Sequence, residues 1–366
     1  MSKKIIISGG GTGGHIFPAI AIANAIKTIE PTVDILFVGA IGRMEMEKVP
    51  KAGYPIEGLP VMGFPRKLSL KIFKFFISLY TSMAKARRVV KAFRPDVVVG
   101  VGGYASGPVM RVASRRGIPC LIQEQNSFPG ITNRLLAKKA SVICVAYQGL
   151  EKYFPADKIV LTGNPVRQDI LDASDKRNEA LRFFGLDGNL PVILSVGGSL
   201  GAYTINESIR ENKDFFAENK IQILWQTGKP YFEKAKIAAM GSESFIFPHD
   251  FIYRMDLAFA AADVVISRAG ASTISELCLV AKPSVFVPSP NVSEDHQTKN
   301  AMALVNRQAA LMVTDAEARK NLMPVVKSII ENKTLQETLT TNISRMALPG
   351  SAEIIAKKVL QLAYEK

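Results

Sequence analysis

The chain has 366 residues, 48% of them hydrophobic, and a formal net charge of +14. This length is too great for one ordinary core and predicts two domains, each with enough apolar residues to bury a core of its own. No uncharged apolar stretch approaches the roughly 20 residues that span a bilayer, and the glycine-rich segment after Lys3 and Lys4 excludes a signal peptide.

The charge and the cysteines limit the class of protein further. The excess of basic residues suits RNA, an anionic membrane or a phosphorylated substrate. Cys120, Cys144 and Cys278 are odd in number, far apart, and each lies in an apolar run. They predict buried free thiols in a reducing compartment and disfavour a disulfide framework or a metal site.

The chain opens with the pattern of a doubly wound parallel sheet. Residues 4–8 predict a strand, residues 9–14 a glycine loop, residues 15–29 a helix and residues 34–38 a second strand. Gly9, Gly11 and Gly14 match the dinucleotide fingerprint, so a NAD or FAD enzyme must be considered. Such an enzyme usually has an acid at the end of the second strand, and none follows Val38 directly. We therefore disfavour a dinucleotide function.

Residues 64–94 interleave apolar and basic side chains, with no acid from Arg66 through Arg94. Much of this segment is predicted to be helix. A basic face beside leucine, isoleucine and phenylalanine suits an anionic membrane surface. A core helix whose lysines are merely solvated is the alternative, and both interpretations stay open.

Further strands are predicted to bring polar residues to one edge of the first sheet. The strand that begins near Asp96 runs into a glycine loop before Tyr104, and the strand from Cys120 ends in Glu124, Gln125 and Asn126. Since the carboxyl ends of parallel strands line the ligand crevice, these residues should lie beside the first glycine loop. Helix is predicted for residues 133–139, and residues 163–165 predict an exit from the first domain.

The second half repeats this form. Residues 190–196 predict a strand, residues 197–202 a glycine loop, and a helix follows from Ile205, so the chain resembles two Rossmann-like units in tandem. Additional strands are expected at residues 221–228, 245–248 and 283–288. A helix at residues 352–363 could close over the first domain.

Residues 267–276 are the stretch around which the chain is organised. The apolar run 260–266 predicts a buried strand, and an amphipathic helix follows Gly270, where we expect a tight turn. Unpaired amides at the helix start would make a seat for a pyrophosphate, and Glu276 could accept hydrogen bonds from a ribose diol. A plain strand–turn–helix connection with capping Ser and Thr is the alternative.

Several segments in order resemble the MurG family of bacterial N-acetylglucosaminyltransferases, over nearly the whole chain. They are the first glycine loop with residues 15–19, and residues 123–126, 163–167, 197–202, 267–270 and 295–301. The resemblance implies the GT-B architecture, two Rossmann-like domains facing across a cleft. It implies a first domain of residues 1–165 plus the helix 350–366, which meets acceptor and membrane, and a UDP-sugar domain of residues 166–349.

The resemblance also implies site residues for UDP-N-acetylglucosamine. In the second domain, Arg167, Ser199 and the helix start would meet the phosphates, Ile252 the uracil, Glu276 the ribose and Gln297 the sugar. Thr12, Gly13, Gly14 and Asn126 would reach this donor from the first domain. The helix start and its first turns comprise Ala271, Ser272, Thr273, Ile274 and Ser275. His296 stands where some family members carry a second glutamine.

For the reaction, the resemblance implies inverting transfer of the sugar to lipid I, undecaprenyl-pyrophosphoryl-MurNAc-pentapeptide, which gives lipid II for peptidoglycan synthesis. His15, at a helix N-terminus whose dipole disfavours the imidazolium, is the expected general base, and Glu124 is the rival. The sequence has no Asp-x-Asp near the site, so neither a metal nor a cofactor is expected.

The implied location is the cytoplasmic face of the bacterial inner membrane, as a peripheral enzyme. Three alternatives remain at this point: another GT-B transferase with a different sugar nucleotide or acceptor, an oxidoreductase, and a nucleic-acid-binding protein. The last is suggested by charge alone, because no reader motif is present, and we expect no nucleic acid partner.

Overall fold

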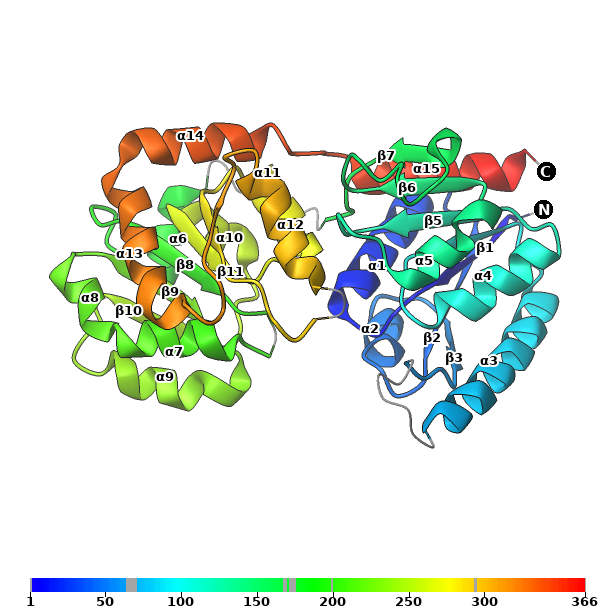
Figure 1. Cartoon of the computed structure of the whole chain (residues 1–366), viewed down its shortest axis with the longest axis horizontal. Coiled ribbons are helices and arrows are strands. Elements are labelled where there is room, and N and C mark those ends of the chain that lie inside the picture. Colours follow the sequence, from blue (N-terminus) through cyan, green and yellow to red (C-terminus); the bar gives the residue numbers. More distant parts are fainter. Residues whose placement is uncertain are drawn as a thin grey trace. The chain divides into compact units, whose positions relative to one another are not determined.

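The computed structural model describes residues 2–63, 71–166, 170, 176–198, 200–292 and 295–365, with the backbone but not the side chains of residues 71 and 72. The chain forms two compact units (Figure 1). Unit 1 contains Met1–Val166 and Pro349–Lys366, and unit 2 contains Arg167–Leu348. Both are parallel-sheet α/β domains, as the sequence predicts.

Within the described residues, unit 1 has a sheet of seven parallel strands in the order β3-β2-β1-β4-β5-β6-β7. The strands are β1 (Lys4–Ser8), β2 (Asp34–Ala40), β3 (Ile56–Leu59), β4 (Val97–Gly100), β5 (Cys120–Glu124), β6 (Val142–Val145) and β7 (Ile159–Leu161). The order reverses beside β1, which places the carboxyl ends of β1 and β4 next to each other. This is the switch point at which doubly wound sheets bind ligands.

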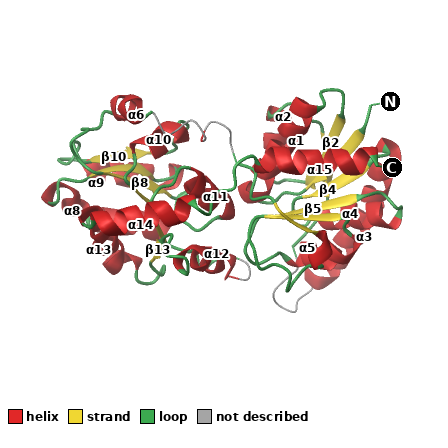
Figure 2. Ribbon diagram, turned by 90° about the horizontal axis from the view of Figure 1, so that it is seen from above, coloured by secondary structure: helices red, strands yellow, loops and turns green. Residues whose placement is uncertain are grey.

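The helices of unit 1 cover both faces of its sheet (Figure 2). They are α1 (Gly13–Ile29), α2 (Glu45–Lys51), α3 (Lys71–Phe93), α4 (Ser106–Arg115), α5 (Ile131–Leu136) and α15 (Ser351–Tyr364), with short 3₁₀ turns at Ala137–Lys139 and Ala156–Lys158. Successive residues of β1 alternate: Ile5 and Ile7 pack with α1 and α15, and Ile6 packs with α3 and α4. Residues of α15 such as Ile355 and Val359 are fully buried against α1. The predicted C-terminal helix thus completes the core of unit 1.

Unit 2 has a six-stranded parallel sheet in its described part, in the order β10-β9-β8-β11-β12-β13. The strands are β8 (Val192–Val196), β9 (Gln222–Gln226), β10 (Ile246–His249), β11 (Val264–Ser267), β12 (Ser284–Phe286) and β13 (Leu311–Met312). The order reverses between β8 and β11, so the loops that follow these strands lie at the second switch point.

The helices of unit 2 also cover two faces. They are α6 (Arg177–Phe184), α7 (Tyr203–Glu211), α8 (Lys213–Glu218), α9 (Phe232–Ala239), α10 (Met255–Ala261), α11 (Ala271–Leu279), α12 (His296–Val305), α13 (Ala318–Glu331) and α14 (Lys333–Ser344), with a 3₁₀ turn at Lys229–Tyr231. Helices α7, α8, α9 and α13 share one core with Trp225 and Ile266 of the sheet. Helices α6 and α10 pack together on the other face (Figure 2).

Two glycines permit close backbone contacts between loops. At Gly201, with φ +76°, a Cβ would lie 2.0 Å from the carbonyl oxygen of Thr227. At Gly103, with φ +81°, a Cβ would lie 2.3 Å from the carbonyl oxygen of Gly10. A side chain at either position would strain the backbone and separate the two loops. Each unit thus has a glycine loop locked against a neighbouring loop.

Some predicted boundaries are wrong. The apolar run 260–266 does not form one strand, because Ala260 and Ala261 end α10 and the strand is Val264–Ser267. A run that is buried on all sides has no periodicity to separate helix from strand. The predicted buried thiols are confirmed: Cys120, Cys144 and Cys278 are free and buried, and burial raises the pKa of each thiol to about 12.

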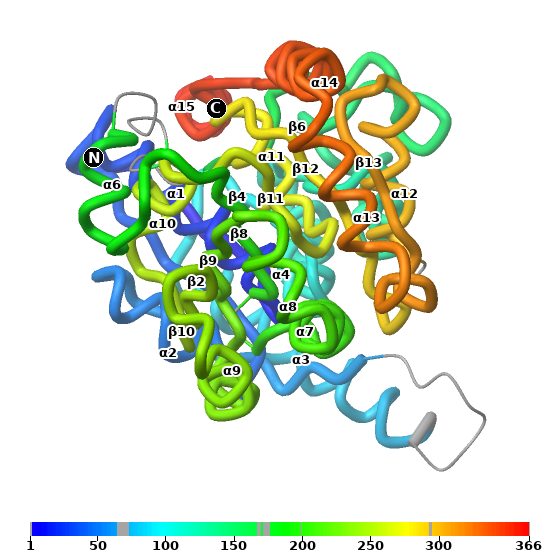
Figure 3. The backbone as a smooth tube through the Cα atoms, turned by 90° about the vertical axis from the view of Figure 1, so that its left-hand side faces the viewer, coloured from blue at the N-terminus to red at the C-terminus, as the bar shows by residue number. Residues whose placement is uncertain are grey.

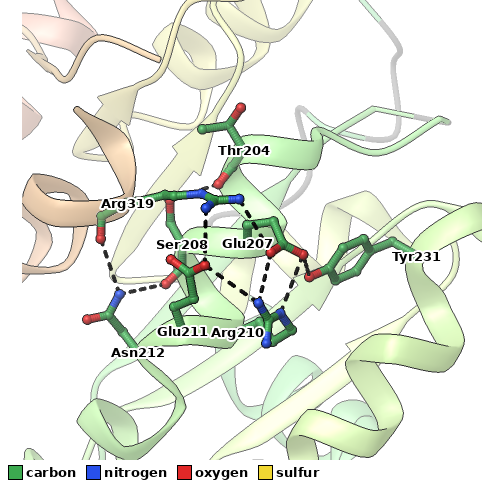
Figure 4. Close-up of polar contacts among 8 residues, drawn as sticks. All are labelled: Thr204, Glu207, Ser208, Arg210, Glu211, Asn212, Tyr231 and Arg319. Carbon is green, nitrogen blue, oxygen red and sulfur yellow. Dashed lines mark hydrogen bonds and ion pairs between the residues drawn. The ribbon is translucent and has the colours of Figure 1, made fainter. Parts of the chain in front are cut away.

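A charge network fixes α7 to its neighbours in unit 2 (Figure 4). The carboxylate of Glu207, 5% exposed, accepts hydrogen bonds from Arg210 Nη2 at 2.9 Å and from the hydroxyl of Tyr231. Arg319 of α13 contacts the same carboxylate at 3.5 Å. The hydrogen bond from Arg210 is the main reason that the pKa of Glu207 falls to about 2, below the ordinary value of 4.5. Folding therefore favours the ionised form of this group.

Because the folded-state pKa of Glu207 lies below its unfolded value, the charged form stabilises the fold above about pH 4.5, and this contribution disappears as the pH falls toward 2. We predict that Glu207→Gln is less stable than wild type at pH 7. The difference in free energy of unfolding should shrink as the pH falls through this window. Urea unfolding at a series of pH values measures it, and a difference that stays constant from pH 7 to pH 2 would contradict the assignment.

Candidate functional site

The first glycine loop, between β1 and α1, is held from below by a buried carboxylate. Glu45, 1% exposed, accepts hydrogen bonds from the amide of Gly11 at 3.1 Å and from the amide of Ala40 at 2.9 Å. Glu45 was not among the predicted residues, because the dinucleotide pattern has its acid directly after the second strand, whereas Glu45 begins α2. Its carboxylate is engaged inside the protein and does not resemble the exposed ribose acid of dinucleotide enzymes.

His15 lies in the first turn of α1, as predicted, with Thr12 as the residue before the helix. Its Nδ1 lies 3.2 Å from the hydroxyl of Thr12. A Cβ built on Gly102 would lie 2.9 Å from His15 Nε2 and 3.8 Å from Asn133 Nδ2. The structure therefore places the imidazole against Gly102 in the loop after β4, and the side chain of Asn133 lies near the same glycine. Gly13 and Gly14 begin α1, where backbone amides lack intrahelical partners.

Glu124 ends β5 and is 1% exposed. Its Oε1 accepts hydrogen bonds from the backbone and side-chain amides of Asn126, at 3.0 and 3.2 Å. Its Oε2 accepts from Asn133 Nδ2 at 2.8 Å and from the amide of Gly130 at 3.2 Å. Burial raises the pKa of this carboxyl, and the hydrogen bonds from Asn126, Asn133 and Gly130 oppose that rise. The contacts make Glu124 the centre of the loop that carries Asn126.

Buried side-chain amides extend this loop network across the edge of the sheet. Gln125 Nε2 donates to the carbonyl of Val101 at 2.9 Å, and Gln123 Nε2 donates to Asn164 Oδ1 at 3.0 Å. Asn164 Nδ2 in turn donates to the carbonyl of Gln125 at 3.0 Å. The predicted polar cluster after β5 is thus tied to the loop after β4 and to the segment that leaves unit 1.

The first turns of α3 carry an exposed apolar face. Phe73, Phe76 and Tyr80 are 69%, 57% and 73% exposed, and their spacing places them on one stripe of the helix. In Figure 3 the first turns of α3 project from the rest of unit 1. A cavity of about 440 Å³ between α3, α4 and α5 lies beside the stripe, with apolar residues such as Leu79 and Leu135 in its lining. Residues 64–70 of the predicted basic segment lie outside the described residues.

In unit 2, a cavity of about 530 Å³ opens at the carboxyl edge of the sheet. The loops after β8, β11, β12 and β13 line it, together with the first turns of α7 and α11. The lining residues are Val196, Gly197, Gly198, Gly201, Ala202, Tyr203, Thr204, Arg268, Gly270, Thr273, Ser289, Pro290, Asn291, Gln297 and Asp315. The structure therefore brings the second glycine loop, the start of α11 and Gln297 to one cavity, which we call the edge pocket.

The start of α11 differs in one respect from the prediction. Gly270 precedes the helix with φ −71° and ψ 140°, which any residue can adopt, so no glycine-specific turn is made there. A Cβ at this position would meet only Thr273 Oγ1, at 3.8 Å. The missing side chain instead leaves space above the first turn of α11. The hydroxyl of Ser272, in the first turn of this helix, is buried and has no hydrogen-bond partner within the described residues.

The remaining residues predicted on α11 have different environments. Ile274 is 1% exposed and packs in the core, so only its backbone faces the helix start. Ala271 is also buried, and its carbonyl accepts a hydrogen bond from Ser275 Oγ at 3.1 Å. Glu276 is partly exposed, more than one turn into the helix. The amides at the helix start, with the hydroxyls of Ser272 and Thr273, are therefore the groups best suited to an anion.

Gln226 and Gln297 connect the edge pocket to predicted contacts. Gln226 accepts a hydrogen bond from the amide of Ile252 at 3.0 Å and donates to the carbonyl of Gly198 at 3.2 Å. The amide of Ile252 is thus already hydrogen-bonded, and its carbonyl is the backbone group that remains for the expected contact with uracil. Gln297 Oε1 accepts from the amide of Ser289 at 2.9 Å. Gln226 was not predicted as a site residue, because it belongs to no recognisable motif.

Arg268 forms a second connection that the sequence did not reveal. Its guanidinium donates to the carbonyls of Val287 and Pro288, at 2.9 and 3.1 Å, and pairs with Asp315. Asp315 also accepts a hydrogen bond from Thr204 Oγ1 at 2.9 Å.

Two predicted phosphate contacts, Arg167 and Ser199, lie outside the described residues. In the described part of the chain, no cluster of His, Cys, Asp and Glu could hold a metal ion, and no helix is long and apolar enough to cross a membrane.

Comparison with known proteins gives matches to both units. The glycosyltransferase family 28 N-terminal domain matches residues 5–145, and the glycosyltransferase family 28 C-terminal domain matches residues 192–355. A UDP-N-acetylglucosamine--N-acetylmuramyl-(pentapeptide) pyrophosphoryl-undecaprenol N-acetylglucosamine transferase from Parabacteroides distasonis is 55% identical, and the match covers 99% of both chains.

Two further comparisons agree with this match. The protein of the same name from Flavobacterium psychrophilum is 52% identical over 98% of this chain and 97% of its own. The crystal structure of Acinetobacter baumannii MurG superposes with a TM-score of 0.81 at 28% identity, covering 98% of this chain and 99% of that one. The fold of this chain is thus the GT-B fold that the sequence predicts. The chain belongs to glycosyltransferase family 28, in the group of MurG N-acetylglucosaminyltransferases.

Proposed function

We propose that this protein transfers N-acetylglucosamine from UDP-N-acetylglucosamine to the muramoyl 4-hydroxyl of undecaprenyl-pyrophosphoryl-MurNAc-pentapeptide. The observation that carries the proposal is the identity of 55% over nearly the whole chain to relatives that bear this activity in their name. The geometry of the edge pocket supports it, because the start of a helix and a glycine loop there suit a diphosphate.

The donor is held by unit 2. The diphosphate lies at the start of α11, against the amides of residues 272 and 273 and the hydroxyl of Ser272. The helix dipole stabilises the charge that develops on the departing UDP, and Arg167 and Ser199 add donors. The uracil ring stacks near Ile252 and hydrogen-bonds to its carbonyl. Glu276 accepts hydrogen bonds from the ribose hydroxyls, and Gln297 contacts the N-acetylglucosamine.

The acceptor is held by unit 1, and the step is a single inverting displacement. The 4-hydroxyl oxygen forms a bond to C1 of N-acetylglucosamine while the bond from C1 to the β-phosphate oxygen breaks, and UDP leaves with both electrons of that bond. His15 takes the hydroxyl proton at Nε2. For this, Nδ1 must carry the ring proton and donate it to Thr12 Oγ1, 3.2 Å away, which leaves Nε2 unprotonated. Thr12, Gly13 and Gly14 from the first glycine loop, and Asn126 from the loop after β5, contact the donor.

The acceptor is a membrane lipid, so unit 1 docks peripherally on the cytoplasmic face of the bacterial inner membrane. The exposed stripe of Phe73, Phe76 and Tyr80 enters the interface, and Lys74 on the same helix faces lipid phosphate. Arg87, Arg88 and Lys91, farther along α3, add positive charge. This arrangement supports a membrane role for α3 over that of a plain core helix.

A direct assay tests the reaction. With radiolabelled UDP-N-acetylglucosamine and a lipid I analogue, we expect labelled lipid product, and much less label from UDP-glucose or UDP-N-acetylgalactosamine. His15→Ala should lower kcat by about 10²–10⁴-fold with the melting temperature preserved, since it removes the base. A loss below tenfold would show that His15 is not the base. Equal use of every UDP-sugar would favour a different family 28 transferase.

Glu124→Gln separates the two roles open to that residue. If Glu124 organises its loop, the NH₂ group of the new side chain will face N–H donors that now bond to a carboxylate oxygen, and it cannot accept their hydrogen bonds. We then expect the free energy of unfolding to fall by about 1–3 kcal/mol and KM to rise. Asn133→Ala should reproduce both effects. Thermal melts and steady-state kinetics measure them. A collapse of kcat at unchanged stability and KM, not reproduced by Asn133→Ala, would instead make Glu124 the base.

Replacing Phe73, Phe76 and Tyr80 together by Ser should abolish most binding to anionic vesicles, because it removes the apolar stripe. Charge reversal at Lys67, Lys71 and Lys74 should weaken binding and its salt dependence, at about 1 kcal/mol per charge. Co-sedimentation with phosphatidylglycerol vesicles measures both. A matched control replaces Ile237 and Met240, 65% and 67% exposed on and after α9 of unit 2. Vesicle binding that is unchanged in the α3 variants would exclude this helix as the dock.

A further inference from the structure

Arg268 is the residue through which the loops of the edge pocket are joined. It directly follows β11, and its guanidinium reaches the carbonyls of Val287 and Pro288 in the loop after β12. It also pairs with Asp315 in the segment after β13. The Arg268 and Asp315 side chains are 18% and 21% exposed, so this ion pair is largely shielded from water and lines the pocket.

Asp315 carries the connection on to the second glycine loop. Its other oxygen accepts a hydrogen bond from Thr204 Oγ1, and Thr204 lies in the first turn of α7, directly after that loop. The neighbouring strands β8, β11, β12 and β13 therefore have their carboxyl-end loops tied together by one guanidinium and one carboxylate. Loops that are otherwise independent are held in one arrangement.

The connection also fixes the orientation of Gln297. Arg268 holds the carbonyls of Val287 and Pro288, and the next residue, Ser289, presents its amide to Gln297 Oε1 at 2.9 Å. A backbone N–H can only donate, so the oxygen of Gln297 must face Ser289 and its NH₂ group must face elsewhere. Gln297 lines the pocket as a donor. The ligand group that it meets must therefore be an acceptor, such as a sugar hydroxyl oxygen or an acetamido carbonyl.

We propose that Arg268, held by Asp315, is a positioning residue that sets the sugar specificity of the donor site by fixing the Val287–Pro288–Ser289 segment that orients Gln297. The inference rests on the proposed function and adds a residue to it. Arg268 contacts backbone and Asp315 within the protein, so its effect on the sugar is indirect. All three contacts come from one guanidinium nitrogen, Nη1. The lysine side chain is one atom shorter, so its ammonium group would not reach all three acceptors in this arrangement.

Arg268→Lys tests the proposal, because it keeps the charge and shortens the side chain, which withdraws the donor from its three acceptors. By calorimetry, we expect the affinity for UDP-N-acetylglucosamine to fall about tenfold, the size of a lost charged hydrogen bond, and the affinity for UDP to change less than about threefold. The ratio of kcat/KM for UDP-N-acetylglucosamine over UDP-glucose should fall as well. Thr204→Val and Asp315→Asn, which alter one anchor with little change of size, should shift both readouts in the same direction.

Arg177→Lys is the matched control. Arg177 donates to the carbonyl of Ala261 at 2.7 Å and pairs with Asp263 at 3.1 Å, at the opposite end of the same strand β11. Its replacement removes a similar set of contacts from unit 2, so it should lower the melting temperature and leave nucleotide affinities and the sugar ratio unchanged.

The outcomes separate the inference from the proposed function. If Arg268→Lys, Thr204→Val and Asp315→Asn bind both nucleotides as wild type does, or weaken UDP and UDP-N-acetylglucosamine equally, Arg268 does not position the sugar contact and the inference is overturned. Wild-type protein that binds neither nucleotide would refute the proposed function, and the inference with it.

Discussion

Side-chain acceptors for the amides of the strand-end loops are the interaction on which both candidate sites depend. The backbone amides in the loops beyond the strand ends have no hydrogen-bond partner in the sheet. Such a loop is ordered only if side chains accept hydrogen bonds from these amides. In unit 1 the carboxylates of Glu45 and Glu124 do this for the loops after β1 and β5. In unit 2 the side-chain amides of Gln226 and Gln297 do it for Ile252 and Ser289.

The choice between carboxylates and neutral amides matches the ligands proposed for the two units. A diphosphate entering the edge pocket would be repelled by an unpaired carboxylate close to it. Among the lining residues of that pocket, Asp315 is the one acid, and Arg268 neutralises it. The dipole of α11 and the nearby amides are thus left to attract the phosphates. In unit 1 the carboxylate of Glu45 lies beneath the first glycine loop, so its attraction for an anion comes from the start of α1.

The parts of the fold that the sequence predicts are those with strong local signals. Strand, glycine loop and helix at the start of each half stand out because periodicity changes where glycine appears, and the structure confirms β1, α1, β8 and α7. The short strands β3 and β13 carry too few residues for a pattern. The alanine-rich end of α10 looked like a strand, since a fully buried segment has no polar face.

The candidate site divides in the same way. His15 and Thr273 could be named from the sequence because glycine loops and helix starts have recognisable neighbours, and Gln297 because the segment around it resembles the MurG family. Glu45, Gln226 and Arg268 could not, because each acts across the fold on backbone that is distant in sequence. Arg268 stood inside the predicted motif, yet its partner Asp315 is 47 residues away, and only the sheet order brings them together. The conformation of Gly270 likewise depended on tertiary packing.

The return of α15 to unit 1 has a consequence for synthesis. The chain leaves unit 1 after Val166 and comes back at Pro349, and α15 buries Ile355 and Val359 against α1. On the ribosome, unit 2 can complete its core before α15 has emerged, whereas unit 1 must wait with part of its apolar surface uncovered. The nascent N-terminal half is therefore the part of the molecule most in need of a chaperone, although it is made first.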